Sequence, residues 1–185
     1  MNKKFPIAKE GAPFLLISTV LIWISYFFSI DALVYLFTFL FLFILYFFRD
    51  PNRIITEAAN DKVIISPADG KIISIETVSK EEYSQQTMLK VSIFLSIFNV
   101  HVNRFPIPGK IKKIKYYPGK FLAAWNDKAS LLNEQTHFVI EHNNQLFVVK
   151  QIAGLVARRI VWWFKENDMA TKGERFGLIR FGSRV

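Results

Sequence analysis

The sequence lacks cysteine entirely among its 185 residues. Disulfide bonds, thiolate metal sites and cysteine nucleophiles are therefore excluded. It has no internal repeat and no low-complexity linker. Charge is also missing from one region, because Asp31 is the only charged residue between positions 14 and 48. The remainder, 54–185, has a globular composition and is long enough to bury a core.

Basic residues exceed acidic ones, and the formal net charge is +9. From residue 54 onward there are 19 basic and 12 acidic residues. Nucleic acid is one partner for such a surface. Next to a lipid-soluble segment an anionic phospholipid membrane is the better prediction, since each Lys or Arg near the headgroups contributes about 1 kcal/mol. We expect a membrane partner and no nucleic acid.

The apolar segment is too long for a secretory signal peptide, whose apolar core spans about 7–15 residues. As one helix, residues 14–48 would measure about 52 Å, against about 30 Å of hydrocarbon. Asp31 is the expected break between two helical arms, Phe14–Ile30 and Ala32–Phe48. Arms of about 25 Å are short for a full span, so a tilted or shallow hairpin is compatible with them. A buried hairpin in a soluble protein, or one long helix, is the alternative.

Positive residues flank both ends of this segment. Three lysines precede the first arm, and Arg49 and Arg53 follow the second. The positive-inside rule places both ends in the cytoplasm, with Asp31 at the far tip. We therefore expect a membrane-associated helical hairpin with its juxtamembrane segment at 1–53. A second domain, 54–185, would lie on the cytoplasmic face of the cell membrane.

After Arg53 the pattern becomes that of β-strands. The predicted strands are rich in Val, Ile, Phe and Tyr: 63–66, 71–78, 88–98, 110–116, 138–141, 146–152 and 158–164. Turn sequences separate them, including Asn143-Asn144, and one short helix is expected around 123–134. The domain is thus predicted to be mainly β, a short-strand sandwich or barrel, joined to the N-terminal helical hairpin.

Two polar stretches stand at strand ends. In Ser66-Pro67-Ala68-Asp69-Gly70-Lys71, Asp69 is either an ordinary turn residue or a carboxylate that orients a histidine. His101 is either a hydrogen-bonded structural histidine or an active one, and by period two it shares a strand face with Asn103, opposite Arg104. His137 and His142 should point to opposite faces of a strand, so they do not indicate a metal site, and no metal is expected.

The other basic groups and the Gly182-Ser183 pair each allow an ordinary structural explanation beside a functional one. The lysines at 110–115 either guard an edge strand or face anionic headgroups. Arg158 and Arg159 follow Gly154, and arginine forks suit phosphate, although surface solvation is the ordinary explanation. Gly182-Ser183, near the end of the sequence, is on its own most simply a turn.

Together these stretches resemble the short-form phosphatidylserine decarboxylase proenzymes of bacterial and archaeal type. The resemblance rests on five motifs in family order: Phe-Phe-Arg-Asp-Pro-Asn-Arg (47–53), Ser-Pro-Ala-Asp-Gly-Lys (66–71), Asn-Val-His-Val-Asn-Arg (99–104), Gln-Ile-Ala-Gly-Leu-Val-Ala-Arg-Arg-Ile (151–160) and Gly-Glu-Arg-Phe-Gly-Leu-Ile-Arg-Phe-Gly-Ser-Arg-Val (173–185). No single motif is specific, but the set is.

The resemblance implies an enzyme that cuts itself between Gly182 and Ser183. Ser183 would attack the Gly182 carbonyl with His101 as base and Asp69 as its orienting acceptor, and elimination would leave a pyruvoyl group. That group would form a Schiff base with phosphatidylserine, release CO2 and yield phosphatidylethanolamine. His101 is again the candidate for the acid–base step. The implied partners are the lipid substrate and the large and small chains of the same precursor, with a homo-oligomer left open.

The resemblance suggests Arg104, Arg158 and Arg159 as substrate or phosphate contacts. Arg104 stands where longer family members have a second histidine. The sequence also ends two residues after Ser183, whereas relatives continue for several strands, and a three-residue chain offers little surface for packing.

A different class of protein also fits part of the sequence, namely a membrane-tethered carrier module of the biotinyl or lipoyl kind without catalysis. Such a module needs an exposed lysine in a tight hairpin. Met88-Leu89-Lys90 instead lies in an apolar strand. A membrane-bound nucleic-acid-binding protein has only the net charge in its favour.

Overall fold

A computed structural model describes residues 6–56, 60, 62–79, 82–120, 132–154, 159–180 and 183–185. The chain divides into two compact units, residues 1–53 and 54–185. The first is a helical hairpin and the second a β-structure, and each is described by itself. The predicted class, mainly β with two N-terminal helices, is confirmed.

The hairpin consists of a 3-10 turn, η1 (Lys9–Gly11), and two helices, α1 (Ala12–Phe27) and α2 (Asp31–Phe47). Between the helices Ser29 adopts a left-handed conformation with φ of 55°. The amide of Ile30 then donates to the carbonyl of Ser25 and that of Ser29 to Tyr26, which is the Schellman ending of a helix. The break therefore precedes Asp31, contrary to the prediction. Asp31 belongs to the first turn of α2, where a negative charge is favourable.

Small residues line the contact between the two helices. Ser18 and Ser25 are buried there, and their hydroxyls donate to the carbonyls of Phe14 and Leu21 within the same helix. At the base, Phe48 stacks on Phe14 with ring centroids 5.6 Å apart. A Cβ on Gly11 would lie 2.7 Å from Phe48 Cγ, so glycine is needed for this close approach. Within the described α1 and α2, no charged side chain is buried.

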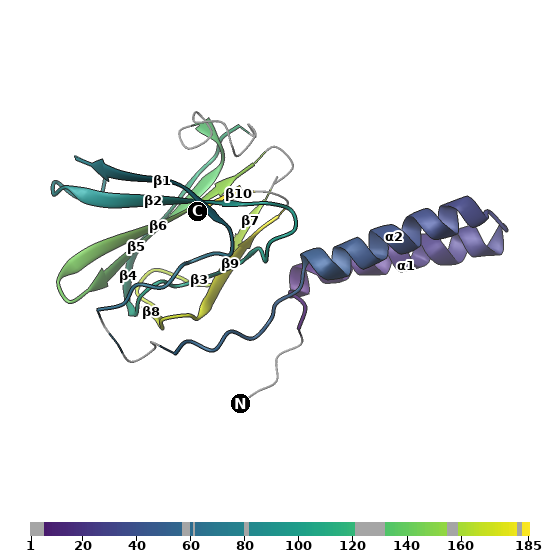
Figure 1. The fold of residues 1–185 in the computed structure, drawn as a ribbon, viewed down its shortest axis with the longest axis horizontal. Helices are drawn as coiled ribbons and strands as arrows, with labels where there is room; N and C mark the ends of the chain where they lie inside the picture. The colour runs from purple at the N-terminus through teal and green to yellow at the C-terminus, as the bar shows by residue number, and fades with distance from the viewer. Residues whose placement is uncertain are drawn as a thin grey trace. The chain divides into compact units, whose positions relative to one another are not determined.

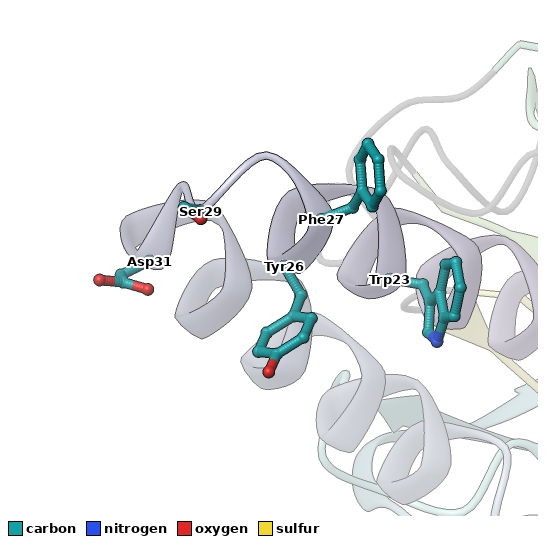
Figure 2. A pocket seen from close by; sticks show the side chains of 5 residues that line it. All are labelled: Trp23, Tyr26, Phe27, Ser29 and Asp31. Carbon is teal, nitrogen blue, oxygen red and sulfur yellow. The ribbon is translucent and has the colours of Figure 1, made fainter.

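The outward surface of the hairpin is apolar around its circumference, with exposed Leu16, Trp23, Phe27, Leu36 and Phe39 among its members. Lys9–Phe27 is long and apolar enough to cross a membrane, whereas Asp31–Phe47 is shorter. A hollow at the tip is lined by Trp23, Tyr26, Phe27, Ser29 and Asp31 (Figure 2). Aromatic side chains with polar ends favour the boundary between hydrocarbon and water.

The described residues of the second unit form ten strands in two sheets (Figure 1). Their bounds are β1 Lys71–Val78, β2 Met88–Leu95, β3 Val102–Arg104, β4 Gly109–Tyr117, β5 Gln135–His142, β6 Gln145–Ala153, β7 Ile160–Trp162, β8 Met169–Ala170, β9 Arg175–Ile179 and β10 Ser183–Arg184. The seven-stranded sheet has the order β1-β2-β10-β6-β5-β4-β8, and the three-stranded sheet the order β3-β9-β7. All the pairings between these strands are antiparallel.

Some local predictions were right and others wrong. Asn143 and Asn144 both have positive φ, 49° and 59°, and form the predicted two-residue turn between β5 and β6. Residues 63–66 are not a strand, because their two backbone bonds, from Val63 to Asn60 and from Ile65 to Pro106, do not form a ladder with another strand. The strands expected at 88–98 and 158–164 are shorter, ending at Leu95 and covering 160–162. The helix expected around 123–134 lies mostly outside the described residues.

Aromatic side chains fill the layer between the sheets. Phe105 is fully buried and stacks on Phe176 of β9, with ring centroids 4.7 Å apart. Phe176 also meets Phe138 of β5 edge-on at 4.9 Å. These three rings connect the small sheet to the large one and belong to the main hydrophobic core. Such contacts add to the free energy of burying the rings.

Replacing Phe105 by Ala should lower the free energy of unfolding by about 3–5 kcal/mol, because it leaves a cavity in this layer. The matched control is Phe98→Ala, since Phe98 is 60% exposed in the turn after β2. That change should cost about 0.5 kcal/mol or less. Chemical unfolding in mild detergent, followed by tryptophan fluorescence, measures both. Equal losses for the two variants would contradict this assignment of the core.

Candidate active site

Three of the sequence motifs meet around the last residues of β2. On one edge of β2, Lys71 pairs with Phe94, which brings in the turn that contains Asp69. On the other edge, Ser183 of β10 pairs with Leu95. The loop that leaves the same end of β2 leads to His101. Residues far apart in the sequence are thus gathered at one strand end.

Ser183 lies between two strands rather than in a turn. It pairs with Leu95 of β2 on one side and with Ala153 of β6 on the other. Paired residues on antiparallel strands point to the same face, and both partners belong to the core between the sheets. The Ser183 side chain therefore points inward, and it is 0% exposed. Gly182, the other half of the predicted cleavage site, is outside the described residues.

His101 is also fully buried, and one of its ring nitrogens has a defined partner. Its Nδ1 lies 3.0 Å from the carbonyl oxygen of Asn99. A carbonyl can only accept a hydrogen bond, so Nδ1 carries the proton and Nε2 is the basic nitrogen of the neutral ring. Asn99 was not predicted as a site residue. Its position two residues before the histidine was the available signal.

The loop before His101 is held by the Asn99 side chain. Asn99 Oδ1 accepts bonds from the backbone amide of Ser96 at 2.9 Å and from the Ser96 hydroxyl at 2.8 Å. Asn99 thus uses its side chain to close the turn after β2 and its carbonyl to orient the imidazole. The rotamer of His101 is set by local geometry.

A direct bond between the two sheets shows which way this region faces. Asn103, two residues after His101, accepts a 2.8 Å bond at Oδ1 from Gln151 Nε2. Gln151 is two residues before Ala153 on β6, so it shares the inner face with Ser183. Asn103 is therefore turned toward the large sheet, and the period of two along an extended segment turns His101 the same way. Ser183 and His101 border the same inter-sheet layer. Gln151 had not been predicted as a site residue.

Asp69 lies half-buried in the turn before β1. The Ser66 hydroxyl donates to the Ala68 carbonyl at 2.7 Å, and the Arg104 amide donates to the Pro67 carbonyl at 2.9 Å. A Cβ on Gly70 would lie 2.3 Å from the Phe94 carbonyl oxygen. Glycine is required there for the turn to approach β2, which explains why Gly70 follows Asp69.

Two of the three predicted arginines are described, and they lie at opposite edges of the three-stranded sheet, Arg104 on β3 and Arg159 before β7. Arg104 is half-buried, and its Nη1 donates to the Gly173 carbonyl at 2.9 Å. Arg159 is exposed just before β7. Arg158 is outside the described residues. Within the described part of the chain, no group of three His, Asp or Glu side chains could hold a metal ion.

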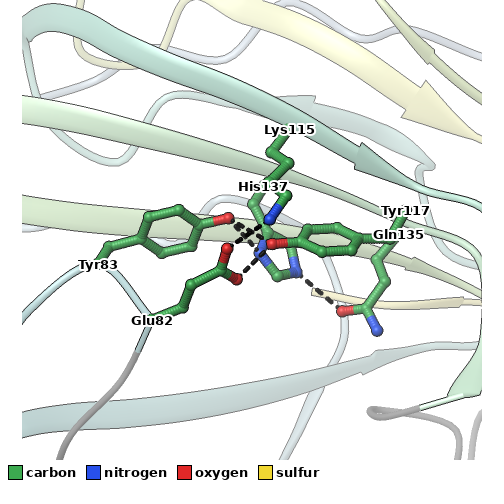
Figure 3. A network of polar contacts seen from close by, with 6 residues as sticks. All are labelled: Glu82, Tyr83, Lys115, Tyr117, Gln135 and His137. Atoms are coloured by element: carbon green, nitrogen blue, oxygen red, sulfur yellow. Dashed lines mark hydrogen bonds and ion pairs between the residues drawn. The ribbon is translucent and has the colours of Figure 1, made fainter.

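A second polar cluster lies on the outer face of the large sheet (Figure 3). His137 Nδ1 is 3.0 Å from the Tyr83 hydroxyl, and its Nε2 is 2.9 Å from Gln135 Oε1. The Tyr83 and Tyr117 hydroxyls are 3.0 Å apart. Burial is the main reason that the pKa of Tyr83 is raised. His137 is therefore a packed, hydrogen-bonded residue that holds the segment before β2 against β4 and β5.

Glu82 completes this cluster at the surface. Lys115 Nζ donates to its Oε1 at 2.7 Å, and the Tyr117 hydroxyl donates to its other oxygen. Hydrogen bonds from Lys115 and Tyr117 lower the pKa of Glu82 to about 2. Another of the lysines at 110–115, Lys112, pairs with Glu141 at 2.8 Å. Two of the lysines at 110–115 are thus neutralised by carboxylates of the same unit.

Comparison with known proteins gives one consistent family. The family model described as phosphatidylserine decarboxylase matches residues 40–185. A phosphatidylserine decarboxylase proenzyme of Desulfotalea psychrophila is 44% identical over 100% of this chain and 86% of its own length. A protein of the same name from Paraburkholderia xenovorans is 44% identical, covering 100% and 87%. One from Cytophaga hutchinsonii is 51% identical, covering 79% and 66%.

Replacing Glu82 by Gln tests the outer cluster through its pH dependence. A folded-state pKa of about 2, below the ordinary 4.5, means that the carboxylate stabilises the fold above pH 4.5 and that this contribution is lost as the pH falls toward 2. At pH 7 the wild type should be more stable than Glu82→Gln by less than about 1 kcal/mol, because the pair is exposed. The difference should shrink at pH 3 when unfolding is measured at both values.

The control for this comparison is Lys115→Met, made in the wild type and in Glu82→Gln. It should reduce stability in the first background and have little effect in the second, since the partner is already gone. Additive effects of the two changes would contradict the coupling.

Proposed function

Because the chain belongs to the phosphatidylserine decarboxylase family, we propose that it is a self-cleaving, pyruvoyl-dependent proenzyme that converts phosphatidylserine to phosphatidylethanolamine and CO2. The observation that carries the proposal for this chain is the buried hydroxyl of Ser183 next to the strand end from which His101 extends. Ser183 Oγ has no hydrogen-bond partner in the described part of the chain. A buried hydroxyl left unpaired is costly, and such sites are commonly reactive.

In the proposed cleavage, Ser183 Oγ attacks the Gly182 carbonyl carbon and His101 Nε2 takes the hydroxyl proton. The bond from the carbonyl carbon to the Ser183 nitrogen breaks, and an ester to Oγ forms. Elimination then transfers the Ser183 Cα proton to a base, breaks the Cβ–Oγ bond, forms a Cα=Cβ double bond and releases Gly182 as a carboxylate. The bond from Asn99 supports this role, since it keeps the proton on Nδ1 and leaves Nε2 as the base. Asp69, half-buried in the adjacent turn, is proposed as a positioning carboxylate.

The prosthetic group of this reaction would be made from Ser183 and not bound from solution. The fit rests on Ser183 itself, a buried serine whose small neighbour Ala153 limits crowding on the inner face. A pyruvoyl ketone supplies an electron sink for the loss of CO2 from an amino acid. His101 is proposed to return the proton to the α-carbon of the lipid headgroup, because it is the buried acid–base group on the same layer.

Phosphate recognition is proposed for Arg104, Arg158 and Arg159. Arg159 is exposed at the start of β7 and is accessible to a lipid phosphate. Arg104 already donates to the Gly173 carbonyl through Nη1. It is therefore proposed to attract the phosphate by its charge and not to form a pair of hydrogen bonds with it. Arg158 is proposed from the family resemblance alone.

Membrane attachment is proposed to occur through the hairpin of residues 1–53. From Asp31 to Arg49 the helical rise is about 27 Å, close to the hydrocarbon thickness of about 30 Å. The exposed apolar surface between these charges supports insertion, and the aromatic tip supports an interfacial end. The hydroxyls that the hairpin buries are satisfied within the helices, as a lipid solvent requires.

The carrier alternative is not favoured by any described contact. Lys90 lies inside β2 and pairs with Glu76 at 3.3 Å, so it is not at the hairpin turn that such a module needs.

Substituting Ser183 by Ala should abolish the break between residues 182 and 183, because no nucleophile remains. His101→Ala should slow the break by at least about a hundredfold, which is the usual contribution of a general base. Intact-mass measurement of the purified full-length chain over time follows both. Cleavage of Ser183→Ala at the same bond would overturn the assignment.

Matched controls are Ser79→Ala in the segment after β1 and His142→Ala at the end of β5. Both residues lie away from the end of β2. Their chains should break at the wild-type rate. Slow cleavage in the controls as well would mean that the His101 result reports a general folding defect.

The membrane proposal predicts that the full chain stays with the membrane fraction in a high-salt wash. Salt screens the attraction of basic groups to headgroups, whereas burial of the apolar hairpin is unaffected. Sedimentation after washing with and without concentrated salt measures this. Release into the supernatant would show that the attachment is electrostatic only.

A further inference from the structure

Four fully buried side chains each have a polar atom that lacks a hydrogen-bond partner in the described part of the chain. The atoms are Ser183 Oγ, Thr136 Oγ1, Gln151 Oε1 and Asn103 Nδ2. All four side chains are 0% exposed. Native proteins have few such atoms, and each unpaired one is costly unless a bound molecule satisfies it. Their occurrence together therefore points to a ligand.

Strand pairing places the four residues in one neighbourhood. Thr136 of β5 is directly opposite Gln151 of β6. Gln151 bonds across the layer to Asn103. Ala153, about 7 Å further along β6, is directly opposite Ser183. The polar atoms thus belong to the inner faces of neighbouring strands, on the same layer as Ser183.

The side-chain amides of Gln151 and Asn103 share one hydrogen bond between the two sheets. Gln151 Nε2 donates to Asn103 Oδ1, but the second bond that two amides can share is absent. One amide NH2 group and one amide C=O remain without a partner in the described part of the chain, and exchanging the N and O positions of both side chains leaves the same set. A Cβ on Gly177 would be 3.0 Å from Gln151 Nε2. The glycine therefore gives the Gln151 amide the space to reach the second sheet.

We propose that Asn103, Thr136 and Gln151 form a binding site for one ordered water molecule next to Ser183. A water can accept from the amide N–H, donate to the amide C=O and bond to the Thr136 hydroxyl. Three bonds are typical of a buried water, and water needs little room. A lipid headgroup would need an open cavity, whereas all of these side chains are closed to solvent.

The water has a chemical use, and this part rests on the proposed function. After elimination, residue 183 is CH2=C(NH2)–CO–, which becomes CH3–C(=NH)–CO– by moving one proton. Water adds to the imine carbon, a C–O bond forms, the C–N bond breaks and NH3 leaves. The product is CH3–CO–CO–, and nothing is oxidised or reduced. Since Ser183 is closed to bulk solvent, the water for this step has to be held inside the protein.

The site itself is tested without any cleavage. A high-resolution crystal structure of Ser183→Ala should show a water within hydrogen-bond distance of the Asn103 and Gln151 amides and Thr136 Oγ1. In the same structure of Ser183→Ala combined with Thr136→Val, this water should be lost or displaced. A well-ordered region without any water at the amides would overturn the site.

The role of the water is tested by comparing two readouts in one sample. Intact mass gives the fraction of chain cut at 182–183, and phenylhydrazine labelling gives the ketone formed at residue 183. In Thr136→Val and Gln151→Met the ketone should appear at least about tenfold more slowly than the cut, because the water is no longer positioned. Two control variants are Thr136→Ser, which keeps the hydroxyl, and Thr77→Val, which changes an exposed residue of β1. In both, as in the wild type, the ketone should form at the same rate as the cut.

Ketone that follows cleavage in Thr136→Val and Gln151→Met as closely as in the wild type would refute the role. A wild-type chain that is never cut would refute the proposed function instead, and the water site would still be decided by the crystal structures. The two failures are therefore distinguishable.

Discussion

In the described structure, the large sheet is continuous because the short strand β10 lies between β2 and β6. Val185 continues the pairing, since its amide donates to the Ile93 carbonyl at 2.9 Å and the Ile93 amide donates back at 2.7 Å. The hairpin β1–β2 is joined to the other four strands through these few residues. The serine proposed to react is thus also a residue on which the continuity of the sheet depends. Its backbone is fixed on both sides before any chemistry begins.

This constraint explains why the proposed chemistry lies inside the molecule. A serine paired on both edges can place its side chain only above or below the sheet, and its partners Leu95 and Ala153 put it on the core side. His101 reaches the same layer from the loop that follows β2. A hydroxyl and an imidazole enclosed by Phe and Ile side chains lose competing contacts with bulk water, which would strengthen a hydrogen bond formed between them during the proposed cleavage. The same enclosure makes an internal water necessary.

The parts of the structure that could be predicted were those determined by residues close together in the sequence. The Asn143-Asn144 turn, the two apolar helices and most long strands have signals within a few residues. Residues 63–66 have the composition of a strand, but without a neighbouring strand to pair with they remain extended loop. Asp31 suggested a break because of its charge, whereas the chain turns at Ser29 and uses Asp31 to begin the next helix.

The site was only partly predictable for the same reason. The resemblance to a known family named Ser183, His101 and Asp69 as candidates, but not their neighbours. The insertion of β10 between β2 and β6 pairs residues about ninety and thirty positions apart, and no local rule predicts such partners. Asn99 and Gln151 became visible as site residues only through contacts that the fold creates. The advance signals were the position of Asn99 two residues before His101 and the polar type of Gln151 among apolar strand residues.

The cut at Ser183 is proposed to create the catalyst for a lipid decarboxylation. The most direct measurement follows CO2 released from phosphatidylserine vesicles and the fraction of cut chain in the same preparation. We predict that CO2 release rises in proportion to the cut fraction and is absent from the uncut Ser183→Ala chain. Release of CO2 by that uncut chain would contradict the account.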